Sequence, residues 1–176
     1  LNGAIYKMDW RDYQTSTYNA DISSVAYTEN VGNAEINGYE INANYSINDS
    51  SNITFYLNKN EPILSEDYYY ADGELAANAG NRLASTPRTA YYISFDKDLT
   101  FMGKAAYLIA DYSYTGERFT SYENGAFKLP DYAIANIRAG FDASDKTSIE
   151  LYISNLTDED AYLSRYDDFS EVGDSG

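Results

Sequence analysis

The sequence predicts an all-β protein, an antiparallel meander of about seven long strands. Apolar and polar side chains alternate with a period of two through most of the 176 residues, which is typical of strands with two different faces. The segments between these strands alternate between short and long. No segment keeps a helical period, and the alanine-rich stretch at 75–79 is long enough for only one helical turn.

The segment 38–47 shows the strand pattern most clearly, and the turn residues at 48–51 end it. Its apolar face carries Tyr39, Ile41, Ala43, Tyr45 and Ile47, and its polar face carries Glu40, Asn42, Asn44 and Ser46. We expect the other strands at 2–14, 53–58, 89–96, 105–114, 133–141 and 147–155.

The lengths of the connections predict which end of the sheet each one occupies. Short turns are expected at 48–51, 97–103 and 143–146, and long segments at 15–33, 61–88, 115–130 and after Thr157. In an antiparallel meander this alternation puts all the short turns at one end and all the long loops at the other. Outer-membrane barrels have this layout.

Tyrosine favours the membrane barrel over a soluble alternative. It occurs 20 times, often towards strand ends, at Tyr39, Tyr45, Tyr91, Tyr112 and Tyr132. A phenol ring at a water boundary suits the aromatic belt of a barrel. The alternative is a secreted β-sandwich that binds carbohydrate through its tyrosines.

Charge and composition exclude several classes of function. The net charge is -16 and there is no His or Cys, so nucleic-acid binding, thiolate chemistry, His-dependent catalysis and ordinary zinc sites are not expected. The acidic clusters at 158–160 and 167–168 lack calcium-loop spacing. A glycosidase with paired carboxylates is compatible with this composition, but the adjacent Glu66 and Asp67 should point in opposite directions. We therefore expect no enzyme, no cofactor and no metal.

Four stretches in order carry a family resemblance. They are N-x-G-x-A-x-x-x-G-x-E at 30–40, G-x-x-L-x-x-x-P at 80–87, L-P-x-Y-x-x-x-N-x-R-x-G at 129–140 and N-L-T-D-E at 155–159. Together they resemble the C-terminal half of the barrel of TonB-dependent outer-membrane receptors. The resemblance covers most of the chain, from Asn30 to Glu159.

The resemblance implies that the chain is part of a larger barrel, and it also implies a transport function. The family's barrel has about 22 strands, and residues 1–176 look like a partial C-terminal barrel domain of about strands 15 to 21. Neither the family's plug domain nor its last strand is seen in this sequence. The implied function is import across the bacterial outer membrane of a siderophore, haem, cobalamin or oligosaccharide, with energy from TonB delivered through the plug. The expected partners are outer-membrane lipid, TonB and the small ligand.

The two strand faces give two sets of predicted residues. The lumen-facing set is Glu40, Asn42, Asn44, Asp111, Asn136 and Arg138. The lipid-facing set is Tyr39, Ile41, Ala43, Tyr45, Ile137 and Phe141. Arg138 is expected to pair with a carboxylate on a neighbouring strand, such as Asp111 or Glu150.

The long loop at 61–88 contains the predicted ligand-binding residues. They are Tyr68, Tyr69, Tyr70 and Asp72, where three consecutive aromatic rings adjoin acidic side chains. Tyrosine stacks on sugar rings or flat aromatic ligands and also donates hydrogen bonds. The alternative is a solvated loop in which the tyrosines pack on neighbouring loops.

Overall fold

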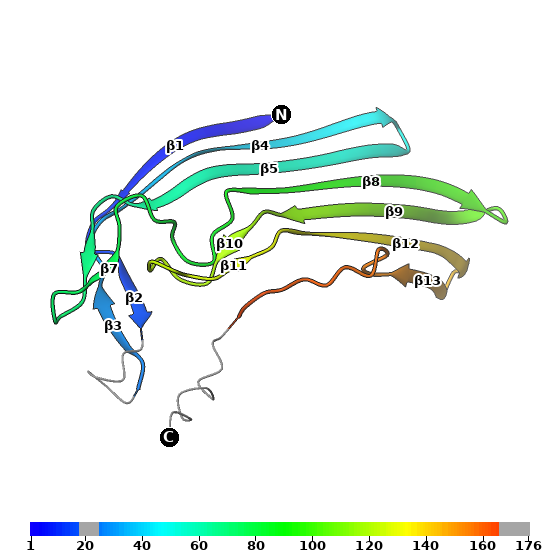
Figure 1. Cartoon of the computed structure of the whole chain (residues 1–176). Helices are drawn as coiled ribbons and strands as arrows, with labels where there is room; N and C mark the ends of the chain where they lie inside the picture. Colours follow the sequence, from blue (N-terminus) through cyan, green and yellow to red (C-terminus); the bar gives the residue numbers. More distant parts are fainter. Residues whose placement is uncertain (18–24, 166–176) are drawn as a thin grey trace, which may run out of the picture.

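The computed structural model describes residues 1–17 and 25–165. Seven long strands form one antiparallel sheet in which the neighbours follow one another along the chain (Figure 1). They are β1 (Asn2–Trp10), β4 (Ala34–Asn48), β5 (Ser51–Leu64), β8 (Thr89–Phe101), β9 (Lys104–Thr115), β12 (Tyr132–Ser144) and β13 (Thr147–Ile153). This confirms the predicted all-β meander.

Three small hairpins accompany the sheet. They pair β2 (Gln14–Thr17) with β3 (Tyr27–Asn30), β6 (Tyr68–Tyr69) with β7 (Leu75–Ala77), and β10 (Arg118–Phe119) with β11 (Lys128–Leu129). They all lie at the end of the sheet opposite the short turns (Figure 1). In the described part of the chain, no second sheet of long strands packs on the first, so the β-sandwich alternative is wrong.

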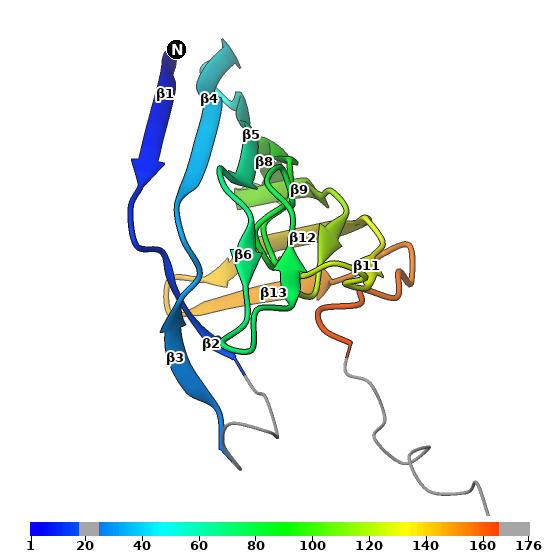
Figure 2. The same ribbon diagram turned by 60° about the vertical axis from the view of Figure 1, so that its left-hand side comes forward.

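The sorting of the connections by length is confirmed. The turns that join β4 to β5, β8 to β9 and β12 to β13 lie at one end of the sheet (Figure 1). The strand direction rotates from β1 to β13 (Figure 2), as the twist of strands built from L-residues requires. A twisted, curved sheet of this kind suits part of a barrel wall.

Two local expectations were wrong. The first strand ends at Trp10, because Asp12 has a positive φ of 52° and Tyr13 instead pairs through its backbone with Val31 and Gly32. The stretch at 75–79 has no helical turn. Leu75–Ala77 is the strand β7, which pairs with β6 and buries Ala76 and Ala77.

The strand register separates a polar face from an apolar face. One row of paired residues runs through Asn44, Thr54, Ser94, Asp111 and Asn136. The adjacent row, on the other face, runs through Tyr45, Ile53, Phe95, Ala110, Ile137 and Ile153. Since side chains alternate along each strand, the predicted alternation extends coherently across the sheet.

Two glycines on the polar face each lie beneath a tyrosine of the paired strand. Gly38 pairs with Tyr6 and Gly140 with Tyr107. A Cβ on either glycine would come within 2.7 Å of the tyrosine ring. Both belong to the sequence motifs quoted above, so the structure gives these motif glycines one shared physical role.

The hydrophobic core lies among the long loops and the ends of β4 and β5 that adjoin them. Its buried residues are Val31, Ala34, Leu64, Tyr68, Ala76, Ala77, Leu83 and Tyr122. The core thus holds the small hairpins together at one end of the sheet. Within residues 1–17 and 25–165 no helix has the length and apolar character needed to cross a membrane.

Candidate functional site

The candidate site is the loop cluster, which comprises β6, β7, β10, β11 and the segments that flank them. Tyr68 lies inside it and is only 8% exposed. Its ring meets Tyr70 and Tyr122 edge to face at 5.9 Å, and its hydroxyl donates to Glu29. Burial, followed by the hydrogen bond to Glu29, raises the pKa of Tyr68. These contacts give Tyr68 a packing role.

The other predicted ligand-binding residues lie nearer the surface. Tyr69 is 53% exposed, whereas Tyr70 is half-buried, and burial followed by a hydrogen bond to Glu123 raises its pKa. Asp72 is exposed, and its Oδ1 accepts from the backbone N–H of Glu74 at 2.9 Å. The structure therefore keeps the four residues in one loop but presents only some of them to solvent. Ligand contact at these positions stays a prediction.

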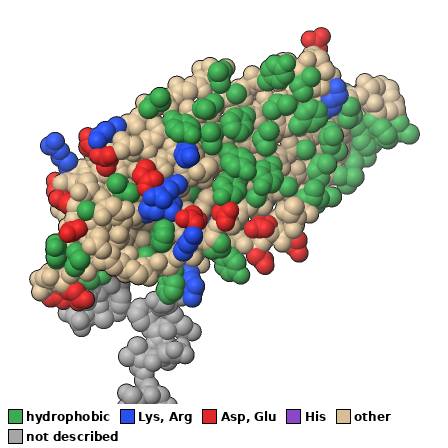
Figure 3. Space-filling model, turned by 45° about the horizontal axis from the view of Figure 1, so that its top comes forward, with side chains coloured by type: hydrophobic (Ala, Val, Ile, Leu, Met, Phe, Trp, Pro, Cys, Tyr) green, Lys and Arg blue, Asp and Glu red, His purple; other side chains and the backbone are tan. Residues whose placement is uncertain are grey.

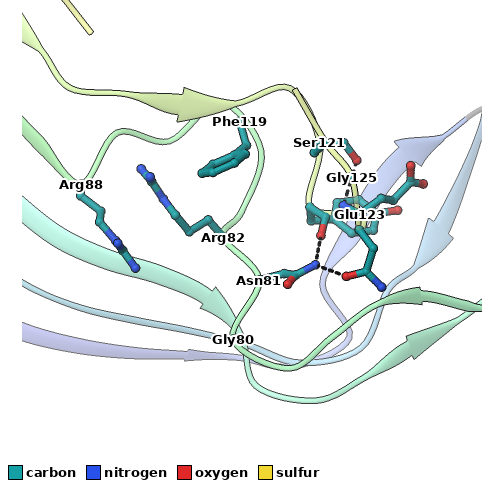
Figure 4. Close-up of a pocket in the computed structure, with 11 residues that line it drawn as sticks. Gly80, Asn81, Arg82, Arg88, Phe119, Ser121, Glu123 and Gly125 are labelled. Atoms are coloured by element: carbon teal, nitrogen blue, oxygen red, sulfur yellow. Dashed lines mark hydrogen bonds between the residues drawn. The ribbon is translucent and has the colours of Figure 1, made fainter. Parts of the chain in front are cut away.

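A cavity of about 310 Å³ lies between the segment after β7 and the hairpin β10–β11 (Figure 4). Its lining residues are Gly80, Asn81, Arg82, Arg88, Phe119, Ser121, Tyr122, Glu123, Asn124, Gly125 and Ala126. The Asn81 amide donates to the Tyr122 carbonyl and to Asn124 Oδ1, both at 2.9 Å. The cavity thus has an amide-rich wall and a wall that carries two guanidinium groups.

Arg82 joins the two loops that form the cavity. It donates to Glu117 Oε1 at 3.2 Å and to the Glu117 carbonyl at 2.8 Å, and its guanidinium lies 5.1 Å from the centre of the Phe119 ring (Figure 4). The Arg82 Nε is buried without a hydrogen-bond partner. Burial, followed by the nearby charge of Arg88, lowers the pKa of Arg82. Arg82 acts as a clamp between loops.

Glu117 extends this clamp to β11. Its carboxylate accepts from Arg82 and from Lys128. The hydrogen bond from Lys128 is the main cause that lowers the pKa of Glu117. The carboxylate therefore stays ionised at neutral pH and bridges two cations that come from different loops.

All six predicted lumen-facing residues lie on the polar face of the sheet. Asn136 donates to Asp111 Oδ2 at 2.7 Å. The carboxylate neighbour of Arg138 is Glu150, with Nε 3.8 Å from Oε1. Of the two partners expected for Arg138, the structure thus shows Glu150, whereas Asp111 bonds to Asn136. Tyr107, which lies over Gly140, also donates to Glu150.

Asn136 also explains the N-L-T-D-E motif. Its Oδ1 accepts from the backbone of Asn155 at 2.9 Å. The Asn155 side chain in turn makes two hydrogen bonds to the backbone of Glu159, at 2.9 and 3.0 Å. These bonds fix the chain where β13 ends. The acidic pair at 167–168 lies outside the described residues.

The predicted lipid-facing residues share the apolar face, which is uncovered. Tyr45 is 66% exposed and Leu151 is 75% exposed, and hydrophobic side chains gather over the sheet on this side (Figure 3). Tyr91 stacks on Tyr114 at 5.0 Å and on Tyr112 at 6.0 Å, near the long-loop end. Tyr132 departs from the expected belt. It pairs with Thr115 on the polar face.

A family model described as TonB dependent receptor-like, beta-barrel matches residues 1–156. The chain belongs to this family. TonB-dependent receptor barrels are transport receptors of the bacterial outer membrane, which is where the uncovered apolar face would meet hydrocarbon. The comparison with curated proteins gives no match.

The family supports TonB-dependent transport at a general level and involves TonB and a small ligand. It is a family of receptors and not of enzymes. In the part of the chain that the structure describes, no group of three or more His, Cys, Asp or Glu side chains could hold a metal ion.

Sequence reasoning missed the cavity. Arg82 lies inside the G-x-x-L-x-x-x-P motif. The sequence analysis noted this motif but did not predict that Arg82 joins two loops. Phe119 and Asn124 carry no sequence signal, because their role comes from a loop that folds back against residues about 40 positions earlier, a contact that periodicity does not report.

Proposed function

We propose that this segment supplies barrel wall and extracellular loops to a receptor that imports a scarce ligand. The ligand classes are siderophores, haem, cobalamin and oligosaccharides, and TonB delivers the energy through a plug domain. Residues 1–176 correspond in this proposal to about strands 15 to 21 of a barrel of about 22 strands. The observation that carries it is membership of the family combined with a sheet whose long loops all leave from one end.

The polar face supports a water-filled lumen. Its rows are rich in amides, hydroxyls and carboxylates that bond across strands, such as Thr54 to Asn44 at 3.0 Å and Ser46 to Asn52 at 2.7 Å. The proposed lumen face therefore satisfies its polar groups partly within the wall. The remaining groups can bind water or the plug.

The loop cluster supports ligand contact at its surface. Tyr69 offers an exposed ring, and Asp72 an exposed carboxylate. The cavity adds Arg88, amides and the edge of Phe119. A flat ring or a sugar could stack on Tyr69, and the cavity offers a separate surface of hydrogen-bonding groups.

Uptake by the full-length receptor tests the proposal. Cells whose growth depends on the receptor are given limiting ferric siderophore, haem, cobalamin or maltooligosaccharide in turn. We expect growth on one class, and Tyr69→Ala should lower uptake of that ligand while the amount of folded receptor stays unchanged. Tyr45→Ala, which removes an exposed tyrosine from the apolar face, is the matched control.

Two results would contradict parts of the proposal. Growth on none of the four ligands would exclude the proposed ligand classes. Equal uptake by Tyr69→Ala and Tyr45→Ala would leave the loop with a packing role only.

A further inference from the structure

Two amide side chains in the cavity between the loops have one end fixed and the other end free. The Asn81 amide nitrogen donates to Asn124 Oδ1 and to the Tyr122 carbonyl. Asn124 Oδ1 also accepts from the Asn78 amide at 2.9 Å. Among the described residues, the Asn81 oxygen and the Asn124 nitrogen make no hydrogen bond.

The fixed ends decide what the free ends offer to a ligand. Because both hydrogens of the Asn81 nitrogen are used, Asn81 presents its oxygen as an acceptor. Because the Asn124 oxygen holds two donors, Asn124 presents its nitrogen as a donor. Both groups are oriented before a ligand arrives, so a ligand that bonds to them loses little affinity to ordering of side chains.

Ser121, Glu123 and Arg88 add further hydrogen-bonding groups to the lining. Ser121 Oγ accepts from the backbone N–H of Glu123 at 3.1 Å, and its hydroxyl proton is left to donate. The Glu123 carboxylate accepts from Tyr70 and has room for a second donor. Arg88, whose side chain is 48% exposed, bonds to Glu61 and keeps other N–H donors. Arg88 lies at one end of the group of lining residues, and Ser121 and Glu123 lie at the other (Figure 4).

The lining has no excess of positive charge. Arg82 pairs with Glu117, and Arg88 pairs with Glu61. Glu123 adds a further carboxylate to the lining. An anionic ligand would therefore meet two neutralised guanidinium groups and one carboxylate of its own sign, so the lining favours an uncharged ligand.

An uncharged ligand for this cavity must both donate and accept hydrogen bonds. A hydroxyl does both, and a sugar ring carries several hydroxyls side by side. Phe119 supplies apolar surface for the C–H groups of such a ring. The volume of about 310 Å³ lies near the lower end of the range for small-molecule sites, so it accommodates a sugar ring more readily than a whole haem or cobalamin.

We propose that this cavity binds one ring of an uncharged oligosaccharide. Hydroxyls of the ring accept from Asn124 and Ser121, and they donate to Asn81 and Glu123. Oligosaccharides are thereby selected from the four ligand classes of the proposed function, on which this inference rests.

Isothermal titration calorimetry of the detergent-solubilised full-length receptor tests this inference. The neutral probes are maltohexaose, cellohexaose, xylohexaose and mannohexaose, and the others are hexagalacturonate, ferrichrome, haemin and cyanocobalamin. We expect a neutral oligosaccharide to bind. Asn124→Asp keeps the oxygen that accepts from Asn78 and Asn81 but removes the free donor, so it should weaken binding about two- to tenfold, the usual effect of one hydrogen bond.

Glu123→Gln should weaken binding of the same oligosaccharide to a similar extent, because an uncharged amide oxygen is a weaker acceptor than a carboxylate. The two variants change the charge of the cavity in opposite directions, so a loss in both cannot come from charge alone. Ser85→Asp is the control, because it adds a negative charge at an exposed position of the same segment outside the lining. This variant should bind as the wild type does.

Several results would overturn the inference. They are binding of no neutral oligosaccharide, wild-type affinity in Asn124→Asp or in Glu123→Gln, and tighter binding by Glu123→Gln, which is the response of an anionic ligand. Binding and uptake of ferrichrome, haemin or cyanocobalamin alone would overturn it while the proposed transport function stands. An oligosaccharide that binds as expected but is not taken up would contradict the proposed transport function and support the cavity as its binding site.

Discussion

At the scale of single residues, two glycines show why the polar face needs particular positions without side chains. Gly38 and Gly140 let Tyr6 and Tyr107 lie flat across the neighbouring strand. Glycine at a site of close approach often marks a bend in a barrel strand. The two sites differ in what a Cβ would meet. At Gly140 the nearest atoms are all from a tyrosine side chain, whereas at Gly38 they also include a backbone carbonyl.

The substitution Gly140→Ala should destabilise the folded receptor by about 1–3 kcal/mol, the usual cost of an overpacked site. The three atoms nearest to the added Cβ all belong to the Tyr107 side chain, so Gly140→Ala/Tyr107→Ala should recover that part of the loss. At Gly38 the Lys59 carbonyl also lies 2.7 Å from the added Cβ, so Tyr6→Ala should rescue Gly38→Ala only in part. Urea unfolding in detergent measures the free energy of unfolding of the single and double variants in both double-mutant cycles.

The matched control for these cycles is Gly3→Ala, where the nearest atom lies at 3.4 Å. This variant should unfold close to wild type. Rescue of Gly38→Ala by Tyr6→Ala to the same extent as at Gly140 would show that the carbonyl contact does not matter.

At the scale of elements, the loop cluster is held by a bridge of opposite charges. Glu117 joins Arg82, in the segment after β7, to Lys128 on β11. The pKa of Glu117 is lowered, chiefly by the bond from Lys128. A carboxyl whose folded pKa is depressed contributes stability above its ordinary pKa, and that contribution is lost as pH falls through the folded pKa.

We therefore expect Glu117→Gln to loosen the loop cluster at pH 7 and to have progressively less effect below the ordinary carboxyl pKa of 4.5. Amide exchange of residues 118–129, measured from pH 7 down to pH 3.5, reports this difference. Since Glu117 is partly exposed, solvent screening keeps the effect small. Asp49→Asn, in the β4–β5 turn, is the control. A difference between Glu117→Gln and wild type that grows as pH falls would contradict the sign.

The elements also show how far the sequence predicts the structure. The seven long strands and their faces follow from local alternation, so Asn44 and Asp111 were assigned to one face without knowledge of the register. The small hairpins did not follow, because β6–β7 and β10–β11 pair only two or three residues each. Their stability comes from burial of Tyr68, Ala77 and Leu129 in contacts between distant loops, which a period of two does not encode.

At the scale of the whole molecule, one prediction concerns orientation. If the long loops are extracellular, Asp72→Cys in the full-length receptor should react on intact cells with an impermeant thiol reagent, and Asp49→Cys should react only after the outer membrane is permeabilised. Both positions are exposed, so reactivity reports the side of the membrane. Labelling of Asp49→Cys but not Asp72→Cys on intact cells would invert the proposed topology.

If one sheet separates lipid from a wet lumen, the two faces of strand β4 should have different surroundings. Nitroxide labels placed one at a time from Tyr39 to Tyr45 in the reconstituted receptor report collisions with oxygen, which concentrates in hydrocarbon, and with a water-soluble nickel complex. The odd positions, such as Ile41, should collide mainly with oxygen. The even positions, such as Asn42, should collide with nickel or be shielded by the plug, but should show no oxygen maximum. Accessibility to oxygen should therefore alternate with a period of two along β4. Equal accessibility at odd and even positions would contradict the separation of lipid from lumen.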